Sequence, residues 1–196
     1  GDPDVYIVDD EIVLVFVDCT LGDTTFNDED FVKVIYSGVA KEDAAISVTK
    51  LFKDGTNETV YYRFFEYGWN IAIEAALTHD YERIIVDLYD DWNAVDGQFT
   101  DEFSNGAGFD NDTIYIPAKV QVTLNLNGHT INRGLTDDED DGEVIFINDD
   151  ADVIINDGTI KGGFSNSEGG GLYIEGGANV TLNNVNIEEN SVRADD

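Results

Sequence analysis

The chain has 196 residues, of which 42% are hydrophobic, so it can bury a substantial core and is not composed like a disordered segment. Its formal net charge of −32 disfavours binding to nucleic acid phosphates and to anionic lipid headgroups, and favours divalent cations as partners. The lone Cys19 excludes a disulfide within the chain, and no apolar run approaches the roughly 20 residues of a membrane-spanning helix. An acidic surface that serves solubility alone, or adaptation to high salt, would carry the same charge.

Residues 1–66 are predicted to be β-rich and to form a small domain or a cap. Alternating and apolar runs predict strands at residues 4–17, 31–36, 44–52 and 59–65. The segment Asp54-Gly-Thr-Asn57 is typical of a hairpin turn between the last two strands, whereas residues 21–30 are polar and predict turns. No signal peptide is visible, and Gly1-Asp-Pro-Asp4 is typical of a processed start.

Residues 67–196 change character and are predicted to form a capping helix followed by a solenoid. From Trp69 to Leu77 the apolar residues follow the i, i+3, i+4 spacing of a helix, and residues 84–89 predict a strand. From Thr113 onward short apolar strands are expected at residues 114–116, 120–126, 144–147, 153–155, 172–174 and 180–182.

Three of these segments share a register when they are superposed on Asn127, Asn156 and Asn183. Each then has an isoleucine four residues further on, at Ile131, Ile160 and Ile187, and the offsets between segments are 29 and 27 residues. A repeat of this size indicates a solenoid in which each repeat is one coil and identical side chains stack on each other. The three asparagines are therefore expected to form a hydrogen-bonded turn ladder, and not a ligand site.

The segments Trp69-Asn-Ile-Ala-Ile-Glu-Ala-Ala76, Leu124-Asn-Leu-Asn-Gly-His-Thr-Ile131 and Asn156-Asp-Gly-Thr-Ile160 also carry a family resemblance. Residues 69–192 resemble the N-terminal part of right-handed parallel β-helices of the pectin-lyase-like class. More narrowly, they resemble large prokaryotic surface proteins with adhesin-like or polymorphic-outer-membrane-protein-like repeats. The resemblance implies a mainly β fold: a right-handed parallel β-helix of about three coils, with an N-terminal β-rich region and one capping helix.

Enzymes of the pectin-lyase-like class imply either calcium with an Arg or Lys base, or clustered aspartates with Gly-His-Gly and Arg-x-Lys segments. Here Gly128-His129 is followed by Thr130, and no Arg-x-Lys occurs. His129 is therefore expected to stabilise a turn, and no catalytic residue is predicted.

The strongest metal signal is the run Asp137-Asp-Glu-Asp-Asp-Gly-Glu143, which has six carboxylates in seven residues. Alternate carboxylates approach the first half of an oxygen-ligand calcium loop, and acids on the next turn could complete it. The predicted calcium ligands are Asp137, Glu139, Asp141, Glu143, Asp149 and Asp150. A solvated acidic loop is the alternative, and a second acidic cluster lies at residues 110–112, with Asp101 and Glu102 near it in sequence.

The preferred functional interpretation is an extracellular, cell-surface, adhesin-like protein that binds glycans, host proteins or neighbouring proteins without catalysis. One alternative is a calcium-dependent polysaccharide lyase or glycoside hydrolase. Another is a structural subunit that self-associates through an open coil end or edge strands into a filament or surface layer.

Overall fold

The computed structural model describes residues 11–21, 24–35, 37–94, 106–110, 113–135, 142–166 and 169–192, with the backbone alone for residues 11–35. Within these residues the protein is mainly β, with one α-helix, so the mainly β prediction is confirmed. No helix in the described ranges is long and apolar enough to cross a membrane.

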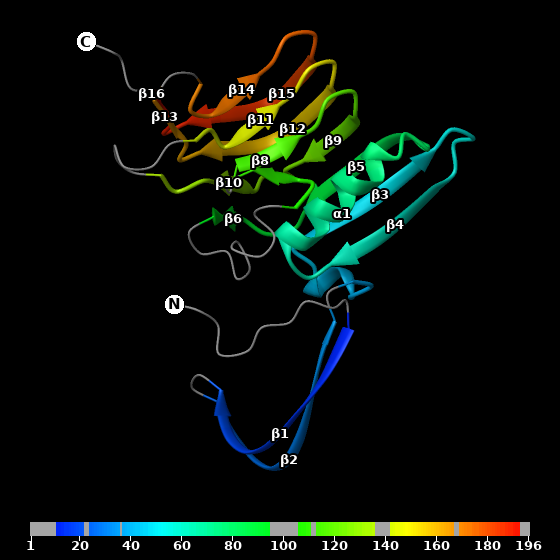
Figure 1. Ribbon diagram of the computed structural model, residues 1–196, viewed down its shortest axis with the longest axis vertical. Helices are drawn as coiled ribbons and strands as arrows, with labels where there is room; N and C mark the ends of the chain where they lie inside the picture. The colour runs from blue at the N-terminus through cyan, green and yellow to red at the C-terminus, as the bar shows by residue number, and fades with distance from the viewer. Residues whose placement is uncertain are drawn as a thin grey trace.

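The first two strands, β1 (Glu11–Leu21) and β2 (Thr24–Ile35), pair with each other in an antiparallel ribbon. Figure 1 shows this ribbon as a long extended hairpin. The prediction of turns between residues 24 and 30 was wrong, because the backbone of this polar segment pairs with β1 as far as Leu21 opposite Thr24. A polar sequence can form a strand when its partner supplies the hydrogen bonds.

A second antiparallel group precedes the repeats and includes the helix. Its elements are the 3-10 turn Lys41–Asp43, β3 (Ile46–Phe52), β4 (Asn57–Tyr62), α1 (Phe65–Leu77) and β5 (Tyr81–Leu88). β3 pairs with β4 on one side and with β5 on the other, which confirms the predicted hairpin. In its turn, the Thr56 hydroxyl and backbone N–H both donate to Asp54 and hold the pKa of that carboxyl below its usual value.

The predicted strand 59–65 is shorter than expected, and the helix is longer. β4 ends at Tyr62, and α1 begins at Phe65, four residues before Trp69. Residues four apart lie on one helix face, and the Phe65 ring stacks on Trp69 with ring centroids 6.1 Å apart. Residues 61–69 hold six Tyr, Phe and Trp side chains besides Arg63, Glu66 and Gly68, and this contact places the end of that segment in the helix.

The remaining strands are two to five residues long, except β12 and β15, which have ten residues each. They are β6 (Trp92–Asn93), β7 (Phe109–Asp110), β8 (Thr113–Ile116), β9 (Gln121–Asn125), β10 (Thr130–Asn132), β11 (Ile145–Ile147), β12 (Asp152–Lys161), β13 (Phe164–Ser165), β14 (Leu172–Ile174), β15 (Asn179–Glu188) and β16 (Ser191–Val192).

These strands pair in parallel rows that repeat from one layer to the next. One row is β5–β9–β12–β15, another is β6–β10–β12, and another is β8–β11–β14; β13 pairs with β16. The sheets are mixed, because β3 pairs antiparallel with both β4 and β5, and β7 pairs antiparallel with β8. Figure 1 shows the layers stacked from α1 and β5 at one end to β14 and β15 at the other.

The isoleucine register predicted from sequence is confirmed by this pairing. Ile131 lies beside Ile160, and Ile160 beside Ile187. The asparagine register needs a correction, because Asn156 pairs with Asn125 and Asn183, not with Asn127. The turn between β9 and β10 has two more residues than the equivalent turn within β12. Asn127 and Gly128 both take positive φ in the first of these turns, whereas Asp157 alone does so in the second.

Each layer turns at corners that carry a residue with positive φ. The corner that precedes the β9, β12 and β15 row is made by Lys119 (φ 64°), Asp150 (φ 56°) and Gly177 (φ 84°), each two residues before a paired position. The left-handed conformation reverses the chain within few residues, at a small cost for Asp or Lys compared with Gly. Recurrence of this conformation keeps successive layers in register.

α1 fills the end of the stack with aromatic side chains. Trp69 is fully buried and donates its indole N–H to the Gly108 carbonyl at 2.8 Å, while Trp92 of β6 donates to the Glu66 carboxylate at 2.8 Å. Phe65 packs on Trp92 with ring centroids 5.1 Å apart. The proposed domain boundary at residue 66 stays a prediction; β3 and β4 lie in the same sheet as β5.

Replacing Ile160 by Ala should destabilise the protein much more than the same change at Ile187. Both residues occupy the same register position, but Ile160 is fully buried, whereas Ile187 is 44% exposed. We expect Ile160→Ala to cost about 2–5 kcal/mol of unfolding free energy and Ile187→Ala about 1 kcal/mol or less, measured by urea denaturation followed by circular dichroism. Equal losses would contradict this burial gradient along the stack.

Candidate functional site

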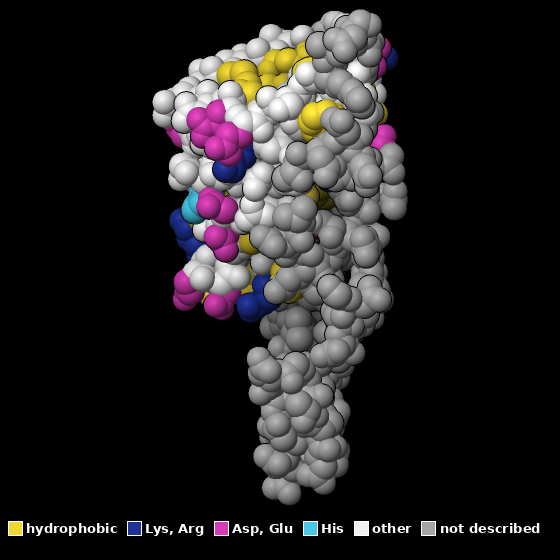
Figure 2. Space-filling view, turned by 90° about the vertical axis from the view of Figure 1, so that its left-hand side faces the viewer, with side chains coloured by type: hydrophobic (Ala, Val, Ile, Leu, Met, Phe, Trp, Pro, Cys, Tyr) yellow, Lys and Arg dark blue, Asp and Glu magenta, His cyan; other side chains and the backbone are white. Residues whose placement is uncertain are grey.

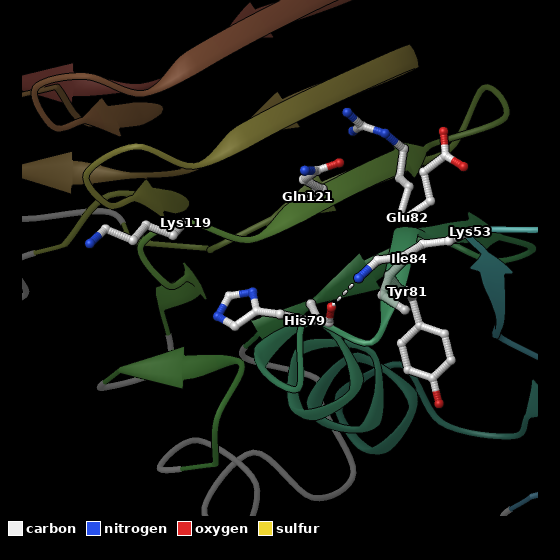
Figure 3. Close-up of a pocket in the computed structure, with 9 residues that line it drawn as sticks. Lys53, His79, Tyr81, Glu82, Ile84, Lys119 and Gln121 are labelled. Carbon is white, nitrogen blue, oxygen red and sulfur yellow. Dashed lines mark hydrogen bonds between the residues drawn. The ribbon is translucent and has the colours of Figure 1, made fainter.

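A pocket of about 250 Å³ lies where the C-terminal end of α1 and β5 meet the turn before β9. Figure 3 shows its lining side chains, which come from segments distant in sequence. They are Lys53, Ala76, His79, Tyr81, Glu82, Arg83, Ile84, Lys119 and Gln121. Three of the ten basic residues of this very acidic chain, and one of its two histidines, therefore line one pocket.

Lys53 lines the pocket beside the C-terminal end of α1. Its ammonium donates to the His79 carbonyl at 3.1 Å (Figure 3). His79 lies two residues after the end of α1 at Leu77, and its φ of 56° turns the chain into β5. A cation at this position opposes the negative end of the helix dipole.

Arg83 forms a wall of the pocket and joins three layers of the stack. Its guanidinium donates to the Asp152 carboxylate at 2.6 Å and to the backbone carbonyls of Val122 and Asp152 at 3.0 and 3.3 Å. The Arg83 side chain is only 17% exposed, so this charge pair is well shielded from water. Arg83 is thus a structural cross-link between β5, β9 and β12.

Lys119 and His79 remain available to a ligand. Figure 3 shows both side chains on the same side of the pocket, away from the Tyr81 ring. Neither of them forms an ion pair with another residue in the part of the chain described above. Tyr81 is held by an edge contact with Phe52, with ring centroids 5.2 Å apart. The pocket thus combines cationic and amide hydrogen-bond donors with a fixed aromatic ring.

Sequence reasoning missed this pocket. Its cations stand at positions 53, 83 and 119, with no local motif around them. Only the pairing of β3 with β5 and of β5 with β9 brings them together. No repeat or residue spacing in the sequence predicts such a site.

The predicted calcium ligands are only partly within the described residues. Asp137, Glu139 and Asp141 lie outside them, as do Asp101, Glu102 and Asp112 of the second acidic cluster. Glu143 precedes β11, whereas Asp149 and Asp150 lie in the turn that follows it, so Glu143 is on the opposite end of this strand from the two aspartates. In the described ranges, no three His, Cys, Asp or Glu side chains are grouped so that they could hold a metal ion. The calcium site stays a prediction.

Asparagine side chains connect the layers along one row of strands. Asn125 donates to Asp87 at 2.9 Å, Asn156 donates to Asn125 at 2.8 Å, and Asn183 donates to Asn156 at 2.8 Å. The predicted ladder therefore exists with Asn125 in place of Asn127. Asn127 instead lies at the corner, where its amide donates to the Leu88 carbonyl at 3.1 Å.

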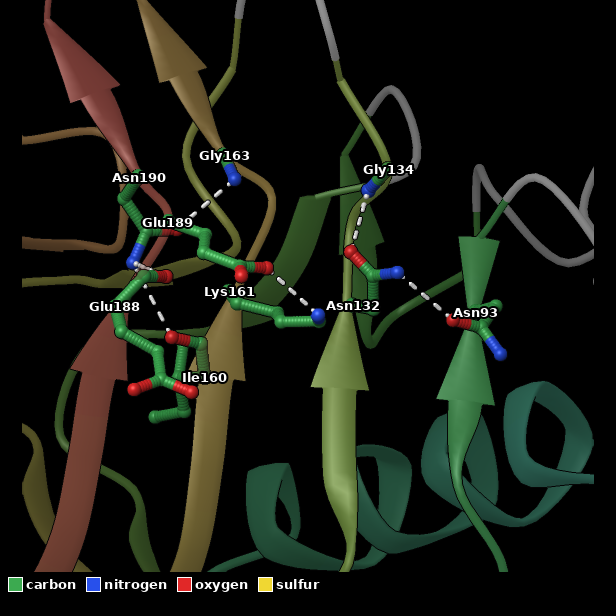
Figure 4. A network of polar contacts seen from close by, with 9 residues as sticks. All are labelled: Asn93, Asn132, Gly134, Ile160, Lys161, Gly163, Glu188, Glu189 and Asn190. Carbon is green, nitrogen blue, oxygen red and sulfur yellow. Dashed lines mark hydrogen bonds and ion pairs between the residues drawn. The ribbon is translucent and has the colours of Figure 1, made fainter.

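A second polar network holds the corner after β10 and β12 (Figure 4). Asn132 donates to Asn93 at 2.9 Å and accepts from the Gly134 N–H, so it joins the layers and its own turn. Asn190 accepts from the Gly163 N–H at 2.9 Å and donates to the Ile160 carbonyl. These amides replace backbone hydrogen bonds where the strands end.

Lys161 forms an ion pair with Glu189 at the same corner, with the Lys161 Nζ 2.7 Å from the Glu189 carboxylate. The hydrogen bond that Lys161 donates to this carboxylate is the main cause that raises the pKa of Lys161 above its usual value. Both side chains are accessible to water, so the contribution to stability is small. His129 lies 3.3 Å from Asp91, whose carboxylate also accepts from the Thr130 N–H, so it is placed at a turn as expected.

Comparisons with protein-family models, with curated proteins and with solved structures found no match to this chain. The site is therefore interpreted from its own residues.

Truncating the middle of the asparagine ladder should cost more stability than truncating its end. Asn156 is bonded on both sides, whereas Asn183 has a single ladder bond. We expect Asn156→Ala to lower the unfolding free energy by about 1–2 kcal/mol and Asn183→Ala by about 0.5–1 kcal/mol in urea melts. A loss at Asn183 as large as that at Asn156 would show that the ladder bonds do not set the difference.

Calcium should raise the thermal midpoint if the acidic segment 137–150 binds it. At 100 times the dissociation constant, one bound ion adds about 2.7 kcal/mol, or roughly 5–10 °C for a chain of this size. The measurement compares melts in calcium, in a chelator and in magnesium at equal ionic strength, with Asp149→Asn/Asp150→Asn as the variant that loses the shift. An unchanged midpoint in calcium would end the structural-calcium hypothesis.

Proposed function

We propose that residues 81–192 form the first coils of a right-handed parallel β-helix and that α1 is its cap. Three observations support this proposal: the parallel rows in register, the recurrent corners with positive φ, and the aromatic side chains of α1 buried at one end. A right-handed path is the general rule for parallel strands connected in this way.

On this scaffold, we propose a non-catalytic binding role at the cell surface, with the pocket beside α1 as a glycan site. The pocket is the observation that carries the proposal. Its 250 Å³ lie slightly below the usual range for small-molecule sites, about 300–1,000 Å³, which suits one sugar ring. Lys119, Gln121 and His79 offer polar contacts to hydroxyl groups, whereas the Tyr81 ring is held by Phe52 and by the Lys50 ammonium, 5.7 Å from the ring centroid.

The charge of the protein narrows the class of glycan. A long polyanion is repelled by a chain of net charge −32, because the repulsion sums over many residues. Lys53 and Lys119 still make the pocket locally positive, so a neutral sugar or one with a single carboxylate fits best. The walls lie on β5 and β9 and on the end of α1, and such rigid elements position a ligand with little loss of entropy on binding.

A second candidate function is assembly through the free end of the stack. We call the outer side of β14, β15 and β16 the open face. Ile174, Leu182 and Ile187 are 40–44% exposed there, and none of these strands pairs with a second neighbour among the described strands on that side. Figure 2 shows hydrophobic side chains gathered at this end of the molecule. Exposed core positions beside unpaired strand edges favour association with another β-layer.

Lys119→Ala should weaken glycan binding about tenfold or more, because a charged hydrogen bond to a ligand is worth about 1.5–3 kcal/mol. The experiment screens neutral and singly acidic sugars on a glycan array and then titrates the retained sugar by calorimetry. Lys41→Ala is the matched control, since Lys41 is exposed and lies over the Tyr89 ring, outside the pocket lining. Failure to retain any sugar, or equal losses in both variants, would refute the glycan site; release of new reducing ends would point to an enzyme.

A further inference from the structure

Two side chains of the pocket stand on left-handed backbone at neighbouring corners. His79 has φ 56° and Lys119 has φ 64°, and both residues line the pocket. Each lies two residues before the start of its strand, which is Tyr81 in β5 and Gln121 in β9. Because β5 and β9 pair in parallel, the two corners lie at the same end of neighbouring strands. The fold thus presents both side chains on one side of the pocket (Figure 3).

Lys119 is an unusual residue for this backbone conformation. A Cβ atom makes the left-handed region costly, and among residues other than glycine it favours Asn, Asp and His. Five of the seven such residues with positive φ in the described ranges follow this preference: His79, Asn127, Asp150, Asp157 and Asn184. The two exceptions are Lys119 and Glu189. The Glu189 carboxylate has a partner in Lys161, which leaves Lys119 as the exception that no contact of its side chain explains.

Lys119 also differs in charge from the residues at the equivalent corners. Those corners carry Asp150 in the next layer and Gly177 in the one after it. In the described part of the chain, no ion pair joins Lys119 to an acid. Among the residues that line the pocket, three are cationic and Glu82 alone is acidic. In a chain of net charge −32, this pocket is therefore a place that attracts an anionic group.

The surroundings of Lys119 limit such a ligand to one negative charge. Arg83 is already paired with Asp152 at 2.6 Å, and the Lys53 ammonium donates to a backbone carbonyl, so the Lys119 ammonium is the cation that can bind an anion. A second anionic group that extended along the row of corners would meet Asp150 and be repelled. A polyuronate does not fit this arrangement, whereas one acidic sugar beside neutral sugars does.

We infer that the pocket binds the carboxylate of a single acidic sugar at the end of an otherwise neutral glycan, with Lys119 as the charged contact and His79 as a second donor. The inference rests on the proposed glycan site and deepens it, because it specifies the ligand and the residue that selects it. A charge-assisted bond is about twice as strong as a neutral one, so it discriminates an acid from its neutral analogue. Lys119 keeps its strained backbone because glycine or asparagine at this corner would remove that contact.

Replacing Lys119 by Gly in the full chain separates binding from stability. Glycine suits φ 64°, so we expect the thermal midpoint to stay the same or to rise by up to about 4 °C. The probes are one neutral oligosaccharide ended either by glucuronic acid or by glucose, each titrated by calorimetry. The variant should bind the acidic probe about tenfold or more weakly and the neutral probe within about threefold of the unmodified protein.

Glu189→Gly is the matched control for the backbone change. Glu189 also has positive φ, but it lies outside the pocket lining, so its replacement should leave the affinity for both probes unchanged. Lys41→Ala again controls for the loss of one positive charge elsewhere on the surface.

The outcomes distinguish this inference from the proposed glycan site. Equal affinity of the unmodified protein for the two probes would refute the inference and leave the glycan site standing, whereas binding of neither probe nor any other sugar would refute both. Tighter binding of a polyuronate than of the singly acidic probe would overturn the limit to one charge. A thermal midpoint lowered by Lys119→Gly would show that Lys119 serves the fold and is not kept for a ligand.

Discussion

In-register stacking of β9, β12 and β15 is the constraint on which the rest of the structure depends. When layers pair in parallel, each side chain meets its equivalent one layer away, so a residue must suit both its own layer and its neighbours. Isoleucine satisfies this at Ile131 and Ile160, which bury each other completely. Asparagine satisfies it at Asn125 and Asn156, because an amide can donate on one side and accept on the other. Charged residues cannot stack in this way without a partner, and Asp152 has Arg83.

At each end of such a stack, the inward side chains lack a neighbouring layer and need another element to cover them. At the first layer the solution is α1, whose buried Trp69 and Phe65 replace the side chains that an earlier layer would supply. β3 completes it by pairing antiparallel with the other edge of β5, and β4 pairs with the far side of β3, as a short hairpin allows. The last described layer has no such element among the described residues, and burial falls from 0% exposure at Ile160 to 44% at Ile187. At this register position Ile131 and Ile160 are both fully buried, so exposure rises only in the last described layer.

The sequence predicts the features that repeat or that depend on local turn chemistry, and it does not predict the others. The isoleucine register, the helix and the hairpin at Asp54 follow from periodicity and turn chemistry, which are local. The register predicts Asn127 in the ladder because Ile131 lies four residues after it, yet its layer holds two extra residues, and the backbone pairing selects Asn125. The pocket cannot be predicted from the sequence for a different reason: Lys53 and Lys119 come to line it only through pairings between distant strands. Insertions in a turn and contacts across a sheet leave no periodic signal.

Periodicity also determines where a ligand can bind. Within the stack the side-chain amides are already bonded to the neighbouring layers, as in the Asp87–Asn125–Asn156–Asn183 ladder, so a ligand there would have to displace hydrogen bonds that hold the fold together. The junction of α1 with β5 lies outside this ladder, and Lys119 and His79 line the pocket there without an ion pair to another described residue. The regularity that makes this scaffold stable thus leaves ligand contacts to the junction between the cap and the repeats.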